Sequence, residues 1–144
     1  MNLRRPTERL ADCVWLPRLI DKCRHRLAGT LAEDYQFAFC NPHATDGAFL
    51  AHFGIDKEEL LRAVAVSEGS DQAVVEWFSA RSGCSSERIA AWNELAPNLG
   101  KEGFPMRRGF LWVLKRYWGG EIPDPRVDSI FMAIAYDEGY IDEL

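Results

Sequence analysis

Residues 16–29, LPRLIDKCRHRLAG, contain the clearest helical pattern in the chain. Apolar side chains recur there every three or four residues, which predicts a helix with one buried face. These side chains are Leu16, Ile20, Cys23 and Leu27. Proline is common in the first turn of a helix and glycine just after the last, so Pro17 and Gly29 agree with these limits.

The segments on both sides show the same periodicity, interrupted by proline, glycine and capping residues. We expect helices over residues 7–14, 16–28, 46–53 and 106–118, and others starting near Asp56, Ser70, Ser85 and Asp124-Pro125. Aromatic and smaller residues alternate in residues 34–44, which indicates an extended loop. The sequence therefore predicts an all-α fold, as a single compact domain (residues 1–144) of six or seven short helices with one extended loop near residues 34–44.

Length and composition agree with one soluble domain. The chain has 144 residues, of which 47% are hydrophobic, and a net charge of −5. This composition excludes a disordered, collagen-like or disulfide-dense chain. The charged opening lacks the apolar core of a signal peptide, and no apolar run is long enough to span a membrane. We expect a cytoplasmic protein with no membrane partner, whose four cysteines are reduced thiols.

The opening of the chain also carries a family resemblance. The residues that carry it are Trp15-Leu16-Pro17-Arg18, Ile20-Asp21-Lys22, Arg24 and Leu27-Ala28-Gly29-Thr30, with weaker matches at residues 53–61, 75–77, 89–93, 126–128 and 137–139. They resemble a family of small bacterial proteins catalogued only as a domain of unknown function. The resemblance implies a stand-alone bacterial cytosolic domain. It supplies no catalytic residues, because the family has no assigned activity.

One polar stripe of the helix over residues 16–28 is the first candidate site. It consists of Arg18, Asp21, Lys22 and His25, which are neighbours at spacings of three and four residues. Two cations, an acid and an imidazole could bind an anionic small molecule or transfer a proton. Trp15 would form a wall of such a pocket. Because the stripe lies opposite the apolar face, we interpret it chiefly as a solvated helix face laced with ion pairs.

The turn Cys40-Asn41-Pro42-His43 is the second candidate site. A thiolate and an imidazole three residues apart could supply half of a zinc site or a nucleophile with its base. No second pair of ligands accompanies Cys40 and His43, so we predict no metal, and the sequence identifies no cofactor. The simpler interpretation is a small, buried cysteine.

The charge is unevenly distributed along the chain. Residues 1–30 carry seven basic and three acidic side chains, and residues 101–118 carry five basic and one acidic. In the second segment Trp112 and Trp118 alternate with arginine and lysine, a mixture that suits nucleic acid. The rest of the chain is acidic and would repel a polyanion, so we expect both tryptophans in the core and no nucleic-acid partner.

We interpret the chain as a ligand- or protein-binding module without its own catalysis, and its partner as an unidentified small molecule or protein. Its working surface would be residues 15–26 with the turn at residues 40–43. One alternative is a small enzyme that acts on an anionic metabolite with a Cys/His/Asp site. Another is local anion or nucleic-acid binding by residues 1–30 and 101–118. A homo-oligomer is compatible with the sequence.

Overall fold

The computed structural model describes residues 2–144 and confirms the all-α fold class. These residues form eight α-helices, two short 3₁₀ turns and one two-stranded hairpin. Their contacts divide the chain into two compact units, Met1–Asn93 and Glu94–Leu144. Each unit is described by itself, and a single domain over residues 1–144 stays a prediction. No helix among residues 2–144 is long and apolar enough to cross a membrane.

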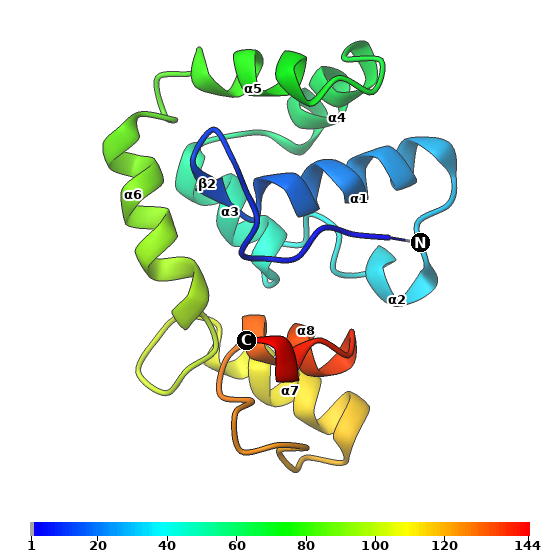
Figure 1. The fold of residues 1–144 in the computed structure, drawn as a ribbon, viewed down its shortest axis with the longest axis vertical. Helices are drawn as coiled ribbons and strands as arrows, with labels where there is room; N and C mark the ends of the chain where they lie inside the picture. Colours follow the sequence, from blue (N-terminus) through cyan, green and yellow to red (C-terminus); the bar gives the residue numbers. More distant parts are fainter. Residues whose placement is uncertain (1) are drawn as a thin grey trace. The chain divides into compact units, whose positions relative to one another are not determined.

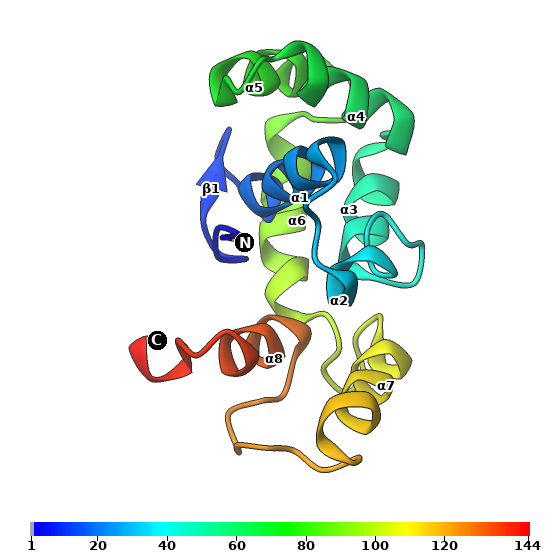
Figure 2. The same ribbon diagram turned by 90° about the vertical axis from the view of Figure 1, so that its right-hand side faces the viewer.

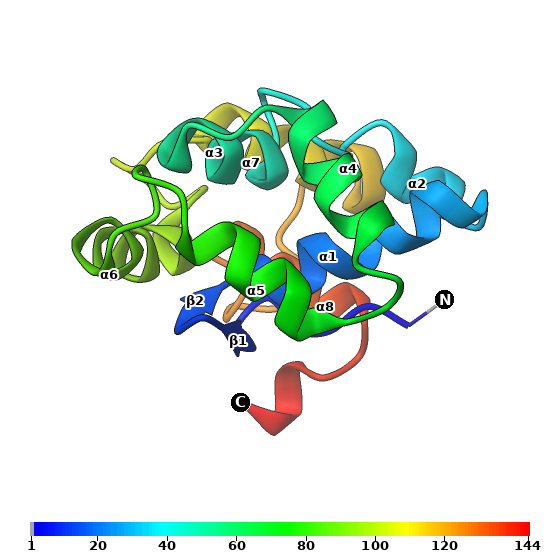
Figure 3. The ribbon, with the colours of Figure 1, turned by 90° about the horizontal axis from the view of Figure 1, so that it is seen from above.

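The first unit is built around α1. It contains β1 (Arg9–Leu10), β2 (Cys13–Val14), α1 (Leu16–Ala28), α2 (Glu33–Gln36), α3 (Thr45–Phe53), α4 (Lys57–Val66), α5 (Asp71–Ser79) and most of α6 (Ser86–Leu95). α1 packs against α4 (Figures 1 and 3). The hairpin and α3 lie on either side of α1 (Figure 2). Both predicted ends of α1 are confirmed, with Pro17 in its first turn and Gly29 left-handed at φ 72°.

Four aromatic rings from three helices form the centre of this unit's core. Phe49 and Phe53 come from α3, Phe78 from α5 and Trp92 from α6. Their ring centroids lie 4.8–6.1 Å apart, mostly in tilted or edge-to-face arrangements. Such contacts stabilise a core beyond the burial of apolar area. Trp92 is completely buried at the centre of this core.

The helix predicted over residues 7–14 is wrong. The strands β1 and β2 form an antiparallel hairpin there, with Ala11 and Asp12 in a two-residue turn at φ 52° and 61°. Two residues of α6 hold the second strand: Trp92 Nε1 donates to Val14 O at 3.0 Å, and Val14 N donates to Asn93 Oδ1 at 2.9 Å. These partners lie almost 80 residues away in sequence. Local helical spacing gives no information about them.

Residues 34–44 differ from the expected extended segment. The chain forms the single turn α2, and Phe39 N then donates to Tyr35 O at 3.0 Å. Residues four apart share a helical face, so Phe39 lies on the same face as Tyr35 and is buried. Phe37 lies on another face and is half exposed. An alternation of aromatic and smaller residues over only five positions does not distinguish a strand from one helical turn.

The second unit contains η1 (Ala96–Asn98), α7 (Arg107–Trp118), α8 (Ile130–Asp137) and η2 (Ile141–Glu143). Its core consists of Phe110, Leu114, Val127, Ala133, Ala135, Tyr140 and Ile141. A long connection, residues 119–129, joins α7 to α8 (Figure 1). The helix expected from Asp124-Pro125 starts only at Ile130, where Ser129 Oγ accepts from Met132 N at 3.2 Å. Asp124 instead accepts hydrogen bonds from Arg126, which lower the pKa of Asp124 to about 2.

Candidate functional site

Two cations of the first candidate site are buried, against the expectation of a solvated helix face. Arg18 and Lys22 stand one turn apart on α1, and only 1% and 4% of their surfaces are exposed. Arg18 Nη1 donates to the carbonyl of Arg4 at 3.1 Å. The sequence could not predict this burial, because the groups that contact this face come from the N-terminal segment, α2 and α3.

Asp46 lies at the centre of this cluster, and the sequence analysis did not select it as a site residue. Its Oδ2 is 2.8 Å from Lys22 Nζ and accepts from Cys40 N at 3.1 Å, while its Oδ1 accepts from Trp15 Nε1 at 2.9 Å. The carboxylate is completely buried in the first turn of α3, where the helix dipole also favours a negative charge. Asp46 is the first residue of the helix predicted over residues 46–53, and no motif in the sequence marks it as a site residue.

Both cations face the same two aromatic rings. The Trp15 ring centroid is 5.6 Å from Arg18 Cζ and 5.5 Å from Lys22 Nζ. The Tyr35 ring of α2 is 5.8 Å and 6.0 Å from the same two atoms. We call Trp15, Arg18, Lys22, Tyr35 and Asp46 the α1 cluster. Aromatic faces attract cations, more strongly where water is excluded.

Trp15 holds an unusual backbone conformation at this site. Its φ is 73°, in the left-handed region, and its N–H donates to Pro6 O at 2.9 Å. A bulky residue in this region costs on the order of 1–3 kcal/mol, and such residues often occur at functional sites. The strained turn starts α1 and orients the Trp15 ring towards the two cations. The ring lies beside Arg18, and its use as the wall of a ligand pocket stays a prediction.

Asp21 belongs to a different group of charges. Arg4 Nη2 lies 2.9 Å from Asp21 Oδ1, and Arg4 Nη1 lies 2.7 Å from Asp71 Oδ2 at the start of α5. Arg24 also pairs with Asp71, at 2.9 Å. Hydrogen bonds from Arg4 and then Arg24 lower the pKa of Asp71. We call Arg4, Asp21, Arg24 and Asp71 the N-terminal ion network, because it ties the start of the chain to α1 and α5.

The two predicted histidines lie outside the α1 cluster. His25 is near the C-terminal end of α1, where its Nδ1 lies 2.8 Å from Thr30 Oγ1. His43 is exposed, and its backbone N–H donates to Asn41 Oδ1 at 2.9 Å. Neither imidazole has an interaction with the buried cations among the contacts described.

Cys40 contributes its backbone, not a reactive thiol, to the α1 cluster. Burial, with a smaller contribution from Asp46, raises the pKa of the Cys40 thiol to about 12. A cysteine nucleophile needs the opposite shift. No three His, Cys, Asp or Glu side chains gather into a metal-binding group within residues 2–144, so no ligands there complete the Cys40/His43 pair. The raised pKa of the thiol argues against Cys40 as a nucleophile.

The basic helix of the second unit differs from its prediction in one respect. On α7, Phe110 and Leu114 are buried, but Trp112 is 48% exposed and not in the core. Trp118 packs partly buried against the core of this unit. The expectation that Trp112 lies in the core is wrong, because Trp112 stands on the opposite face of α7 from the buried Phe110 and Leu114.

Comparison with known families agrees with the resemblance found in the sequence. A family described as Domain of unknown function (DUF5069) matches residues 1–116, which include all of the first unit and most of α7. A search of curated proteins finds no match. The matched region contains the α1 cluster and covers most of the chain. The chain therefore belongs to the DUF5069 family.

Proposed function

We propose that this domain is a binding module for an anionic small molecule and that the α1 cluster holds the ligand. The observation that carries the proposal is the burial of Arg18 and Lys22 side by side against the rings of Trp15 and Tyr35. Cationic groups against aromatic walls suit a carboxylate or phosphate on a partly apolar ligand.

The energetics of the cluster support a role beyond folding. Moving one cation from water into the protein interior costs several kcal/mol. This cost is similar in size to the energy that the cation gains from its ion pair. A buried pair such as Lys22–Asp46 can usually be replaced by neutral residues with little loss of stability. A buried ion pair is weak evidence for a stabilising role, so the cluster is open to a functional one.

A ligand needs a route to these buried groups, and α2 provides one. α2 is a single turn without a buried residue, and Tyr35 presents its ring to both cations from it. Short segments with few buried contacts open at low free-energy cost. In our proposal, α2 moves aside when the ligand enters, and Tyr35 closes over it.

We propose binding without catalysis, in the cytoplasm of a bacterium. The raised pKa of Cys40 and the positions of His25 and His43 outside the cluster favour binding over the enzyme alternative. The acidic segments that surround the basic ones weigh against nucleic acid, as in the sequence interpretation. Free cysteines are usual in reducing compartments, and the resemblance to bacterial proteins supports the source.

Native mass spectrometry of the untagged full chain tests the proposal. We expect the freshly purified protein to exceed its denatured mass by that of a small anionic molecule. R18Q should lose this extra mass, whereas R26Q, an exposed arginine on the same helix, should keep it. An apo mass for the wild-type protein, or equal retention by R18Q and R26Q, would contradict the proposal. The protein-binding alternative would then predict a partner at this surface.

A further inference from the structure

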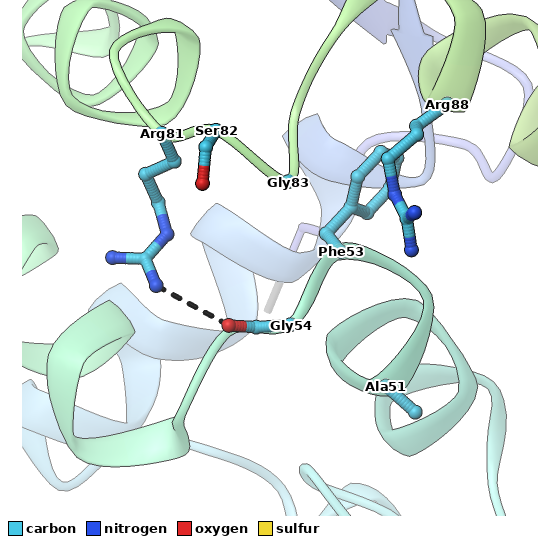
Figure 4. Close-up of a pocket in the computed structure, with 7 residues that line it drawn as sticks. All are labelled: Ala51, Phe53, Gly54, Arg81, Ser82, Gly83 and Arg88. Carbon is cyan, nitrogen blue, oxygen red and sulfur yellow. Dashed lines mark hydrogen bonds between the residues drawn. The ribbon is translucent and has the colours of Figure 1, made fainter.

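The first unit has an open pocket away from the α1 cluster. Its volume is about 620 Å³. It lies between the C-terminal end of α3 and the loop that joins α5 to α6 (Figure 4). The lining residues are Ala51, Phe53, Gly54, Arg81, Ser82, Gly83 and Arg88. None of them belongs to the α1 cluster, so this pocket is separate from the site of the proposed function.

Gly83 allows the loop to approach α3 closely enough to form the pocket wall. A Cβ atom on Gly83 would lie only 2.4 Å from the carbonyl oxygen of Phe53, closer than real Cβ contacts allow. Any larger residue would push the loop away from the end of α3. The close approach places Ser82 and Arg81 opposite Gly54, which ends α3 in the left-handed conformation at φ 66°.

Two arginines on opposite sides of the pocket use one N–H each to cap α3. Arg81 Nη2 donates to Gly54 O at 3.2 Å, and Arg88 Nη2 donates to His52 O at 2.7 Å. These bonds satisfy carbonyls that the end of a helix leaves without partners. Capping alone would be a structural explanation for both arginines, but it uses only part of their five donors each.

The pocket retains unused donors and positive charge after capping. Arg81 pairs with Glu59 at 2.6 Å. Arg88 has no carboxylate partner in the part of the chain that the structure describes. The charges of Arg81, Arg88 and Glu59 therefore leave the pocket with one excess positive charge.

The loop adds neutral donors to the two guanidinium groups. Figure 4 shows the Ser82 hydroxyl pointing from the loop towards the pocket. The backbone N–H groups of Ser82 and Gly83 donate no hydrogen bond within residues 2–144. Guanidinium forks, a hydroxyl and free loop amides are the donor set that proteins use for phosphate oxygens.

We infer that this pocket binds the phosphate group of a small phosphorylated molecule. Arg88 and Arg81 would contact the phosphate oxygens from opposite sides, and Ser82 would donate from the loop. Glu59 would weaken the site by competing for Arg81. An open pocket of this size has room for a ligand larger than the phosphate itself.

The test is a titration of the full-length protein with inorganic phosphate, followed by ¹H–¹⁵N NMR at constant ionic strength. We expect saturable shifts at the amides of Ser82 and Gly83. R88Q should weaken binding about tenfold, the usual effect of losing one charge-assisted pair. R88K, which keeps a charge and a donor, should restore part of the affinity. E59Q should strengthen binding, because it frees Arg81.

R62Q is the matched control, because Arg62 is an exposed arginine on α4 outside the pocket. Unchanged spectra elsewhere in R88Q would show that losing the bond to His52 has not unfolded the chain. The inference would be overturned if the shifts did not saturate or if chloride produced the same shifts. Equal phosphate affinity of R88Q and R62Q would also overturn it. Tighter binding of acetate or malonate than of phosphate would also overturn it, in favour of a carboxylate ligand.

Discussion

Lys22 Nζ lies 2.8 Å from Asp46 Oδ2 in a pair that is almost completely buried, and the two residues come from α1 and α3. The pair joins α1 to a carboxylate 24 residues later in the sequence. Trp15 and Cys40 also donate to this carboxylate. The ion pair is thus the point at which α1, the turn at Cys40 and α3 meet.

Breaking this pair from one side should be costly. K22M leaves the Asp46 carboxylate buried without its cation, and we expect it to lower the free energy of unfolding by about 3–5 kcal/mol. K22M/D46N removes both charges and keeps an acceptor for Trp15, so it should recover most of that loss. Urea unfolding of the three proteins checks this prediction. If K22M alone were as stable as the wild type, the Lys22–Asp46 pair would not be removed from water as the structure shows.

The N-terminal ion network should make stability depend on pH in the acid range. Hydrogen bonds from Arg4 and Arg24 lower the pKa of Asp71, so the folded state favours the ionised carboxylate. This contribution is present above the unfolded pKa of about 4 and is lost as the pH falls through the lower folded value. Relative to the wild type, D71N should be destabilised at pH 6 and much less so at pH 3.

Thermal unfolding at both pH values measures this effect. E121Q, which removes an exposed carboxylate of the second unit, is the control and should differ little from the wild type at either pH. The network would play no part in acid stability if D71N lost the same stability at both values.

The thiols should react slowly in the folded protein. Burial raises the pKa of both Cys13 and Cys40 to about 12 and that of Cys23 well above its ordinary value. Iodoacetamide at neutral pH should therefore label Cys40 at least about tenfold more slowly than a model thiol. Peptide mass spectrometry gives the rate for each cysteine, and labelling in urea gives the unfolded reference. Fast labelling of native Cys40 would restore the nucleophile hypothesis.

Gly83 should be sensitive to the smallest side chain. G83A places a Cβ against the Phe53 carbonyl, and we expect it to cost about 1–3 kcal/mol, the usual effect of overpacking. S82A alters the exposed neighbouring residue and should change stability by less than about 0.5 kcal/mol. Chemical unfolding of both variants compares them directly. Equal stability would mean that the loop does not lie as close to α3 as the structure shows.

Local sequence patterns predicted the helical elements well, because their signals lie within one or two turns. Pro17 and Gly29 enclose α1, and Ser70 caps α5 by accepting from Ala73 N. Asp56 stands at the start of α4, although its side chain makes no capping hydrogen bond. Where the predictions were wrong, partners distant in sequence decide the structure. Hydrogen bonds to Trp92 and Asn93 of α6 hold Val14 in a strand, although its local sequence has a helical pattern.

The candidate site was predicted only in part for the same reason. Spacing on α1 correctly made Arg18 and Lys22 neighbours, and Trp15 was selected beside them. Spacing could not show that this face is buried, since Tyr35 and Asp46 come from other segments. Asp21 has the same spacing pattern but pairs with Arg4. Helical periodicity identifies which residues share a face and does not identify what covers that face.

The most direct test of a ligand site at the α1 cluster compares wild type and K22M/D46N in native mass spectra and urea unfolding. The double variant removes the charges of the cluster without leaving one of them buried alone. We predict that it folds with nearly wild-type stability and loses the small anionic molecule that the wild-type protein retains. A double variant that keeps both its stability and the bound molecule would contradict the account, because the buried charges would then have no part in binding.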